Sequence, residues 1–405
     1  MNLLIKKLPF QTFKNSLFLR LYISQTISLF GDALTWLGLA LLAFELSPDN
    51  SATILSIALT IRVSVFVILS PIAGVIADRV NRKNVLVITH LFRLAIVGLL
   101  PFVETTWQLY ILIGLLNCFN AFFTPTYNAT IPLVFDDEKM YGKAISLSAS
   151  TYQLLGVLGP GIAGAMAAFI GLEQLFYLDS ITFFVAAIII FTLPGKLQVS
   201  SSHLQGRVNK ISWKDLQIGI THLFKNMNLR FPLFMQLVTS IAGAMILVGT
   251  VGYVKGNLNQ SEVEYGWVMA SLGVGASLAA FVLGNINESI SRVRLTIIGA
   301  VVVSLIIIPG NFLPLPFLMI AWFIAGASQS LVNVSMQTLI ALNVPKGEQG
   351  RVYGAHFAWS HLWWAFAYPL SGLIVRFYND RNFMVAGVFA LMLFFIVNFS
   401  SKRNS

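Results

Sequence analysis

Long apolar segments dominate the chain, and short polar segments separate them. A helix needs about 20 residues to cross the roughly 30 Å hydrocarbon core of a bilayer, and each apolar segment is close to that length or longer. The segments are too long and too uniformly apolar to be strands of a membrane barrel. The pattern predicts twelve transmembrane helices, at 18–44, 52–77, 85–102, 107–132, 146–169, 175–193, 231–253, 265–286, 295–312, 317–342, 357–377 and 383–399.

The composition excludes the other common classes of protein. Hydrophobic residues make up 57% of the chain and charged residues 10%, whereas soluble domains carry about 25% charged residues. So few charges cannot cover a water-exposed surface, and so much apolar sequence excludes disorder. Cys118 is the only cysteine, which excludes a disulfide scaffold.

Lysine and arginine positions predict the orientation. With the N-terminus inside, most of the 26 basic residues lie in cytoplasmic segments, as the positive-inside rule requires. We therefore expect both termini in the cytoplasm. The net charge of +10 then reflects membrane topology, and we expect no nucleic-acid partner.

One long polar stretch divides the predicted helices into six and six. Within it, Leu216, Ile220, Leu223 and Phe224 share one face of a short amphipathic helix, which would lie either on the inner leaflet or against the following domain. The predicted organisation is an N-terminal segment (1–17), a six-helix bundle (18–194), a cytoplasmic linker (195–230), a second six-helix bundle (231–399) and a tail (400–405).

A loop motif occurs twice in the chain. After the second apolar segment stands GVIADRVNRK, and 210 residues later GNINESISRV repeats its glycine, acid and arginine with the same spacing. Because each copy lies in the corresponding loop of its half, the two halves are predicted to be duplicates. The second copy consists of Gly284, Glu288 and Arg292.

The first copy resembles the loop signature G-x-x-x-D-R-x-x-R-[RK] of the major facilitator superfamily. Gly74, Asp78, Arg79, Arg82 and Lys83 all match it. The segments SQTISLFGD, FFTPTYNATIP and GEQGRVYG are similar to bacterial exporters of the enterobactin and macrolide efflux subfamily. This resemblance implies an all-α fold of two six-helix pseudo-repeat bundles, in a bacterial inner membrane. It also implies that the loop holds the two halves together at the cytoplasmic side.

The fifth span contains the run GVLGPGIAG. Its glycines allow close helix packing, and its proline removes a backbone hydrogen bond, so a purely structural role is one interpretation. In the superfamily a Gly-Pro motif here is associated with antiporters, which implies export. The fourth span lacks the arginine that drug–proton antiporters of the superfamily often carry. The residues of the motif are Gly156, Gly159, Pro160 and Gly164.

Four charged residues lie within the predicted spans of the first half. Such charges are expensive in lipid and commonly serve function, although a neutral structural network is the alternative. Counted from the span ends, Asp32, Arg62 and Asp179 lie at similar depth and Arg93 is shallower. We expect Asp32, Arg62 and Arg93 at a coupling or substrate cavity, with Asp32 and Arg62 paired as a gate. Asp179 is given a structural role.

The eleventh span contributes aromatic and histidine residues. We expect His361, which lies deeper than His356, and Trp364 to reach the cavity, and Trp359 and Trp363 to form an interfacial belt.

These features predict a secondary transporter, not an enzyme. The sequence lacks an HExxH motif and a Walker glycine loop, and we expect neither a metal nor a cofactor. The preferred function is export of a small amphipathic organic molecule, siderophore- or drug-like, by proton antiport, with the protein acting as a monomer. A lysophospholipid-type transporter and a non-transporting receptor on the same scaffold are the alternatives.

Overall fold

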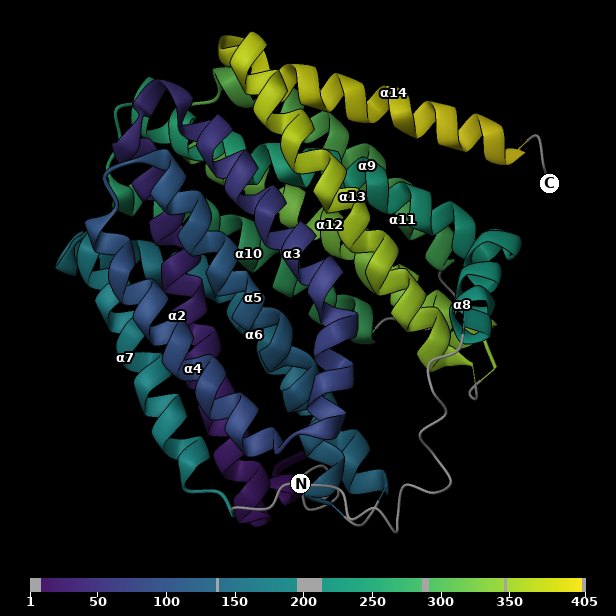
Figure 1. Ribbon diagram of the computed structural model, residues 1–405. Helices are drawn as coiled ribbons and strands as arrows, with labels where there is room; N and C mark the ends of the chain where they lie inside the picture. Colours follow the sequence, from purple (N-terminus) through teal and green to yellow (C-terminus); the bar gives the residue numbers. More distant parts are fainter. Residues whose placement is uncertain (1–8, 136–137, 195–212, 286–290, 346–347, 403–405) are drawn as a thin grey trace, which may run out of the picture. The chain divides into compact units, whose positions relative to one another are not determined.

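The computed structural model describes residues 9–135, 138–194, 213–285, 291–345 and 348–402, and all regular structure in these ranges is helical. Among the helices of these described ranges, twelve are long, and Figure 1 shows how the described helices are arranged. The first six are α2 (Ser16–Leu46), α3 (Ser51–Arg79), α4 (Arg82–Leu99), α5 (Thr106–Thr130), α6 (Glu138–Ile170) and α7 (Leu172–Phe191). After the shorter α8 (Trp213–Lys225) come α9 (Met227–Val251), α10 (Glu262–Asn285), α11 (Arg292–Ile307), α12 (Leu315–Asn343), α13 (Gln349–Phe377) and α14 (Asn382–Lys402).

Short helical segments of three to six residues begin the described chain and connect several of the long helices. They are the 3-10 turns η1 (Pro9–Lys14), η2 (Pro48–Asn50), η3 (Leu100–Phe102), η4 (Ile131–Leu133), η6 (Ile308–Phe312) and η7 (Asn379–Arg381), together with the π-helical turn η5 (Gly252–Asn257).

The twelve long helices coincide with the twelve predicted spans. Among the described residues, ten helical segments are long and apolar enough to cross a membrane. The other two spans correspond to α6 and α13, whose 33 and 29 residues also exceed the roughly 20 that a crossing needs. Large apolar side chains such as Phe281 and Phe399 are 73% and 74% exposed, as lipid-facing residues would be. The predicted all-α membrane fold is confirmed.

Local sequence explains where several helices begin. The side chain of Asn81 accepts a hydrogen bond from the backbone N–H of Lys83 and caps α4. Thr105 and Gln108 form a reciprocal capping box at the start of α5. Each cap satisfies backbone donors that the first helical turn leaves without partners.

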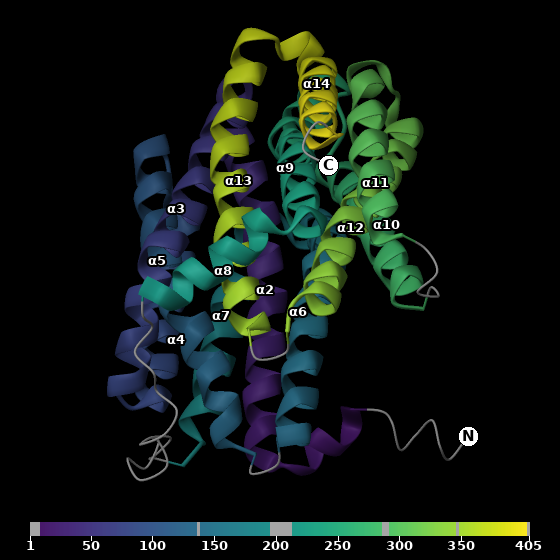
Figure 2. The same ribbon diagram turned by 90° about the vertical axis from the view of Figure 1, so that its right-hand side faces the viewer.

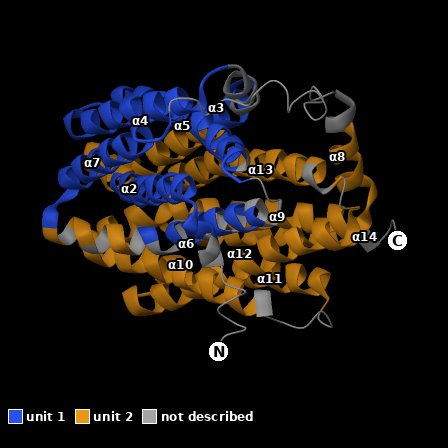
Figure 3. Ribbon diagram, turned by 90° about the horizontal axis from the view of Figure 1, so that it is seen from below, with its two compact units in different colours: residues 1–38, 64–159, 170–208 blue, residues 39–63, 160–169, 209–405 orange. Residues whose placement is uncertain are grey.

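The chain divides into two compact units (Figure 3). Unit 1 comprises residues 1–38, 64–159 and 170–208, and unit 2 comprises residues 39–63, 160–169 and 209–405. The unit boundaries fall inside α2, α3 and α6. The division into bundles at 18–194 and 231–399 stays a prediction.

Within unit 2, the central helix is α9, which packs against α11, α12, α13 and α14. The short helix α8 lies across α13 (Figure 2). Leu223 of α8 is fully buried there, and Phe224 packs edge-to-face on Trp359. Ile220 is 40% exposed, and the side chain of Leu216 lies outside the described ones. The amphipathic face of α8 therefore packs on α13, which is the second of the two predicted arrangements.

Unit 2 also contains the adjoining ends of α2 and α3. A Cβ atom on Gly372 of α13 would stand 2.1 Å from the hydroxyl of Ser56, so α3 and α13 are in close contact. The ammonium of Lys255 in η5 pairs with Glu262 and lies over the ring of Phe44, 5.4 Å from its centroid. The contact at Gly372 therefore places the first half of α3 against α13, and the contact at Phe44 places the end of α2 against η5.

Candidate functional site

Asp32 and Arg93 form an ion pair inside unit 1. Nη2 of Arg93, on α4, stands 2.8 Å from Oδ1 and 2.7 Å from Oδ2 of Asp32, on α2. Nη1 donates to the hydroxyl of Ser28 at 3.2 Å. The side chain of Arg93 is 1% exposed and that of Asp32 is 20% exposed. Each charge therefore depends on the other, because a lone charge so deeply buried is very unfavourable.

The partner of Asp32 in unit 1 is thus Arg93, and the pairing of Asp32 with Arg62 stays a prediction. The prediction compared depths counted from the ends of the spans. The helix α4 begins at Arg82, three residues before the predicted span, and a long arginine side chain covers the remaining difference in height. Arg62 belongs to the residues of unit 2.

Two phenylalanine rings enclose the guanidinium of Arg93. Its central carbon lies 4.0 Å from the ring centroid of Phe183 and 5.2 Å from that of Phe123. A cation over an aromatic face is attracted by the ring quadrupole, and the attraction is stronger away from water. The rings hold the guanidinium in place and exclude bulk water from it.

A second carboxylate, Asp179 of α7, lies next to this ion pair. It is fully buried, and it interacts electrostatically with both Asp32 and Arg93. Its Oδ2 accepts a hydrogen bond from the hydroxyl of Thr35 at 2.5 Å, and its Oδ1 lies 3.0 Å from the hydroxyl of Thr182. Three helices, α2, α4 and α7, therefore bring two acids and one base together.

Gly31 makes this meeting possible. A Cβ atom at position 31 would stand 2.0 Å from Oδ1 of Asp179 and 2.1 Å from the hydroxyl of Thr182. Real side chains do not approach so closely, so only glycine lets α2 reach α7 here. The glycine directly before Asp32 in the segment SLFGD thus has a structural explanation.

Several buried polar atoms on α2 and α4 have no hydrogen-bond partner among the described residues. They are both ring nitrogens of His90, Nε of Arg93 and Oε1 of Gln25. The His90 ring lies between Phe123 and Phe183, with centroid separations of 4.8 and 6.0 Å. Buried polar groups usually bond to protein or to water, so this region has capacity for water or a ligand.

The sequence carried a signal for this cluster that the charges alone did not reveal. Gln25, Ser28, Asp32 and Thr35 recur every three or four residues and form one polar stripe on an otherwise apolar helix. His90 with Arg93, and Asp179 with Thr182, repeat that spacing on their helices. The charged residues Asp32 and Arg93 were recognised as candidates, whereas His90, which is as buried as Arg93, was not.

Unit 2 brings Arg62, His361 and Trp364 into one region. Arg62 of α3 acts electrostatically on His361 and Tyr368, both on α13. Nδ1 of His361 lies 2.8 Å from the carbonyl oxygen of Phe357, which assigns the proton to that nitrogen. The rings of Trp364 and Tyr368 are in contact, with centroids 5.3 Å apart.

Polar side chains from α9 and α12 extend this region. Nε2 of His356 donates to Oε1 of Gln236 at 2.8 Å, and Gln236 donates to Asn333 at 3.0 Å. The amide nitrogen of Gln329 is buried without a partner among the described residues, close to Trp364 across Gly243.

The two tryptophans predicted for an interfacial belt pack on neighbouring helices. Nε1 of Trp363 donates to the carbonyl of Leu233 at 3.1 Å, and the Trp359 ring contacts those of Trp363 and Phe224.

The loop motif before α4 contributes two helix-terminal contacts. Nη1 of Arg82 donates to the carbonyl of Ala129 at 2.6 Å, and Nζ of Lys83 donates to that of Leu193 at 2.6 Å. Both carbonyls lie at helix C-termini, where the backbone dipole favours a cation. The side chains of Gly74, Asp78 and Arg79 lie outside the described ones.

The repeated motif in the second half is described only in part. Nη1 of Arg292 lies 3.4 Å from the carbonyl of Leu283 on α10. Glu288 lies outside the described residues, as does the environment of Gly284.

The Gly-Pro motif lies in α6, which is helical through Pro160. A Cβ atom on Gly159 would stand 2.3 Å from the Cβ of Ala33, so the glycine allows α6 to contact α2 next to Asp32. The described part of the structure does not include the surroundings of Gly156, Pro160 and Gly164.

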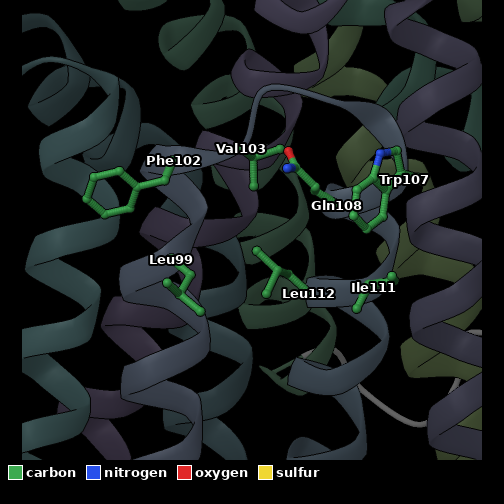
Figure 4. A pocket seen from close by; sticks show the side chains of 7 residues that line it. All are labelled: Leu99, Phe102, Val103, Trp107, Gln108, Ile111 and Leu112. Atoms are coloured by element: carbon green, nitrogen blue, oxygen red, sulfur yellow. The ribbon is translucent and has the colours of Figure 1, made fainter.

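A hollow of about 240 Å³ opens where η3 joins α4 to α5 (Figure 4). Its two large aromatic side chains, Phe102 and Trp107, are 67% and 60% exposed. Exposed aromatics at helix ends are typical of the membrane interface, and the lining has no charged residue, so we do not assign this hollow to the substrate. The lining residues are Leu99, Phe102, Val103, Trp107, Gln108, Ile111 and Leu112.

The model of the Major Facilitator Superfamily matches residues 21–249 and 233–403, which together cover most of the chain. The chain belongs to the major facilitator superfamily. It is 29% identical over 349 residues to the uncharacterized MFS-type transporter YfiS of Bacillus subtilis, covering 82% of this chain and 80% of the relative. It is 27% identical over 291 residues to the multidrug resistance protein MdtG of Salmonella typhi, covering 71% and 70%.

Solved structures show the same fold. The nucleoside transporter NupG superimposes with a TM-score of 0.73 at 16% identity, over 94% of this chain and 98% of that one. As a member of this superfamily, the protein is a multi-pass membrane transporter and not an enzyme.

Proposed function

We propose that this transporter exports a small amphipathic organic molecule, drug- or siderophore-like, across the bacterial inner membrane in exchange for protons. The observation that carries the proposal is the buried ion pair of Asp32 and Arg93, with Asp179 beside it. The relative named for multidrug resistance and the Gly-Pro motif in α6 support export as the direction. We place both termini in the cytoplasm and propose that the protein acts as a monomer.

The cluster suits coupling because protonation of a carboxylate removes a negative charge from beside Arg93. Proton binding therefore changes how the guanidinium of α4 is held by the acids of α2 and α7. A group that changes its interactions on protonation can link proton entry to helix movement, which is what antiport requires.

The polar and aromatic residues of unit 2 suit an amphipathic substrate. Trp364 and Tyr368 offer flat apolar surfaces, whereas His361, Gln329 and Arg62 offer polar contacts. Binding sites for small organic molecules commonly combine a mostly apolar lining with a few polar groups. The similarity to enterobactin and macrolide exporters favours the same substrate class.

Reconstitution into proteoliposomes tests this function. With a pH gradient imposed, an antiporter accumulates substrate on the acidic side of the membrane. Ethidium serves as the drug-like probe and a catecholate as the siderophore-like probe. We expect at least one probe to accumulate with the protein present and to leak back when an ionophore collapses the gradient. Accumulation of neither probe would contradict the proposal.

A further inference from the structure

The cluster in unit 1 contains more acid than base. Two carboxylates, Asp32 and Asp179, lie beside one guanidinium, and Nη2 of Arg93 contacts both oxygens of Asp32. Fully buried Asp179 is contacted by hydroxyl groups instead. An ionised carboxylate with that burial would need a cation or several strong donors.

The hydrogen bonds of Thr182 indicate the protonation state of Asp179. Its hydroxyl lies 2.7 Å from the backbone carbonyl of Asp179 and 3.0 Å from Oδ1. A hydroxyl has one hydrogen to donate, and a carbonyl can only accept. If Thr182 donates to the carbonyl, which is the nearer acceptor, Oδ1 must supply the hydrogen for the second contact. Thr35 then donates to Oδ2, and every group in the set is satisfied.

We propose that Asp179 is the proton-binding site of this transporter and that Arg93 is the cation it shares with Asp32. In one state Asp179 holds its proton on Oδ1 and Arg93 binds Asp32. In the other state the proton has left Oδ1 for water, and Arg93 is divided between two carboxylates. The inference rests on the proposed proton antiport and assigns its coupling residue to α7, where the sequence predicted a structural role.

The surroundings of Asp179 supply what such a site needs. Asp32 faces it from α2, and Arg93 faces it from α4 with His90 beside it. Thr35 and Thr182 are positioning residues for its two oxygens. The unpartnered nitrogens of His90 and Nε of Arg93 give water a polar place to bind close to the ion pair.

Infrared spectroscopy tests the protonation without any substrate. Protonated carboxylic acids have a C=O stretching band that carboxylates lack. A buried acid that holds its proton shows this band at neutral pH. We expect purified wild-type protein at pH 7 to show this band and the Asp179→Asn variant to lose it. The exposed acid Asp49 in η2 provides the matched control, and Asp49→Asn should keep the band. Persistence of the full band in Asp179→Asn would overturn the proposal.

Transport measurements then test the coupling role. In proteoliposomes, Asp179→Asn should lose all accumulation of ethidium driven by the pH gradient, and Asp179→Glu should restore part of it. The control Asp49→Asn, at an exposed position, should accumulate ethidium within about twofold of wild type. Undiminished accumulation by Asp179→Asn would contradict the coupling role.

The two proposals fail in different ways. If wild-type protein accumulates no probe under a pH gradient while the band depends on Asp179, proton antiport is wrong and the buried acid is structural. If wild-type protein accumulates ethidium and the band does not depend on Asp179, antiport stands and its proton site lies elsewhere. Accumulation driven by a sodium gradient and not by a pH gradient would contradict both.

Discussion

Replacing Asp32 by asparagine tests the energetic role of the ion pair. The change leaves Arg93, which is 1% exposed, with an uncharged partner. Removing one member of a buried pair costs about 3–5 kcal/mol, because the remaining charge has lost its compensation. Asp179 lies close enough to give up its proton and take over part of that role, so we expect a value near the lower limit, about 3 kcal/mol.

Thermal unfolding in detergent measures this cost. Domains of about 150–250 residues lose about 2–4 °C of Tm per kcal/mol, so the apparent Tm should fall by about 6–12 °C. Asp49→Asn changes the same group at an exposed position and should leave the Tm within about 1 °C, since isolated surface changes are small.

A second substitution separates charge from shape. In the double variant Asp32→Asn with Arg93→Leu, the lone cation is gone and leucine packs against Phe183 and Phe123. Replacing a whole buried pair by apolar groups is often neutral or stabilising, so the double variant should be more stable than Asp32→Asn alone. This reasoning would be refuted by an Asp32→Asn variant as stable as wild type. It would also be refuted by a double variant less stable than Asp32→Asn alone.

Three further substitutions test other contacts. Gly31→Ala should lower the free energy of unfolding by about 1–3 kcal/mol, because the new methyl group meets the carboxylate of Asp179 on α7. The control Gly98→Ala should leave stability unchanged, because its Cβ meets only the hydroxyl of Ser180 at 3.4 Å. Thermal melting curves of the two variants test this difference. Gly372→Ala should separate α3 from α13 and reduce both Tm and ethidium exchange, whereas Gly354→Ala on the same helix has open space and should resemble wild type. Asp78→Asn should reduce transport severalfold at normal expression, if the loop acts as in related transporters; wild-type flux at equal protein would exclude that role.

The number and positions of the helices could be predicted because lipid imposes a simple rule on sequence. Every backbone group must be satisfied within a helix, so an apolar run of sufficient length specifies a span. The short helix α8 was predicted from its apolar face, but its contact with α13 depends on Gly219, whose missing side chain admits the backbone of Arg351. Close approaches of that kind cannot be inferred from hydrophobicity.

The candidate site could be predicted only in part, because charge is visible in a sequence and pairing is not. Asp32 and Arg93 were recognised as intramembrane charges, yet depth alone did not reveal that they pair. The actual pairing depends on the approach of α2 to α7 at Gly31 and on the reach of the arginine side chain. His90 was missed because only charged residues were compared in depth, although His90 lies one helical turn before Arg93.

Proton movement on substrate addition tests the central claim, the exchange of protons for an organic substrate, most directly. Proteoliposomes contain the wild-type protein and a fluorescent pH indicator, and ethidium is added outside vesicles whose interior is more acidic. Antiport predicts that the interior becomes more alkaline in step with ethidium entry, and that Asp32→Asn and empty liposomes show no such change. Ethidium entry with no change of internal pH would contradict the account.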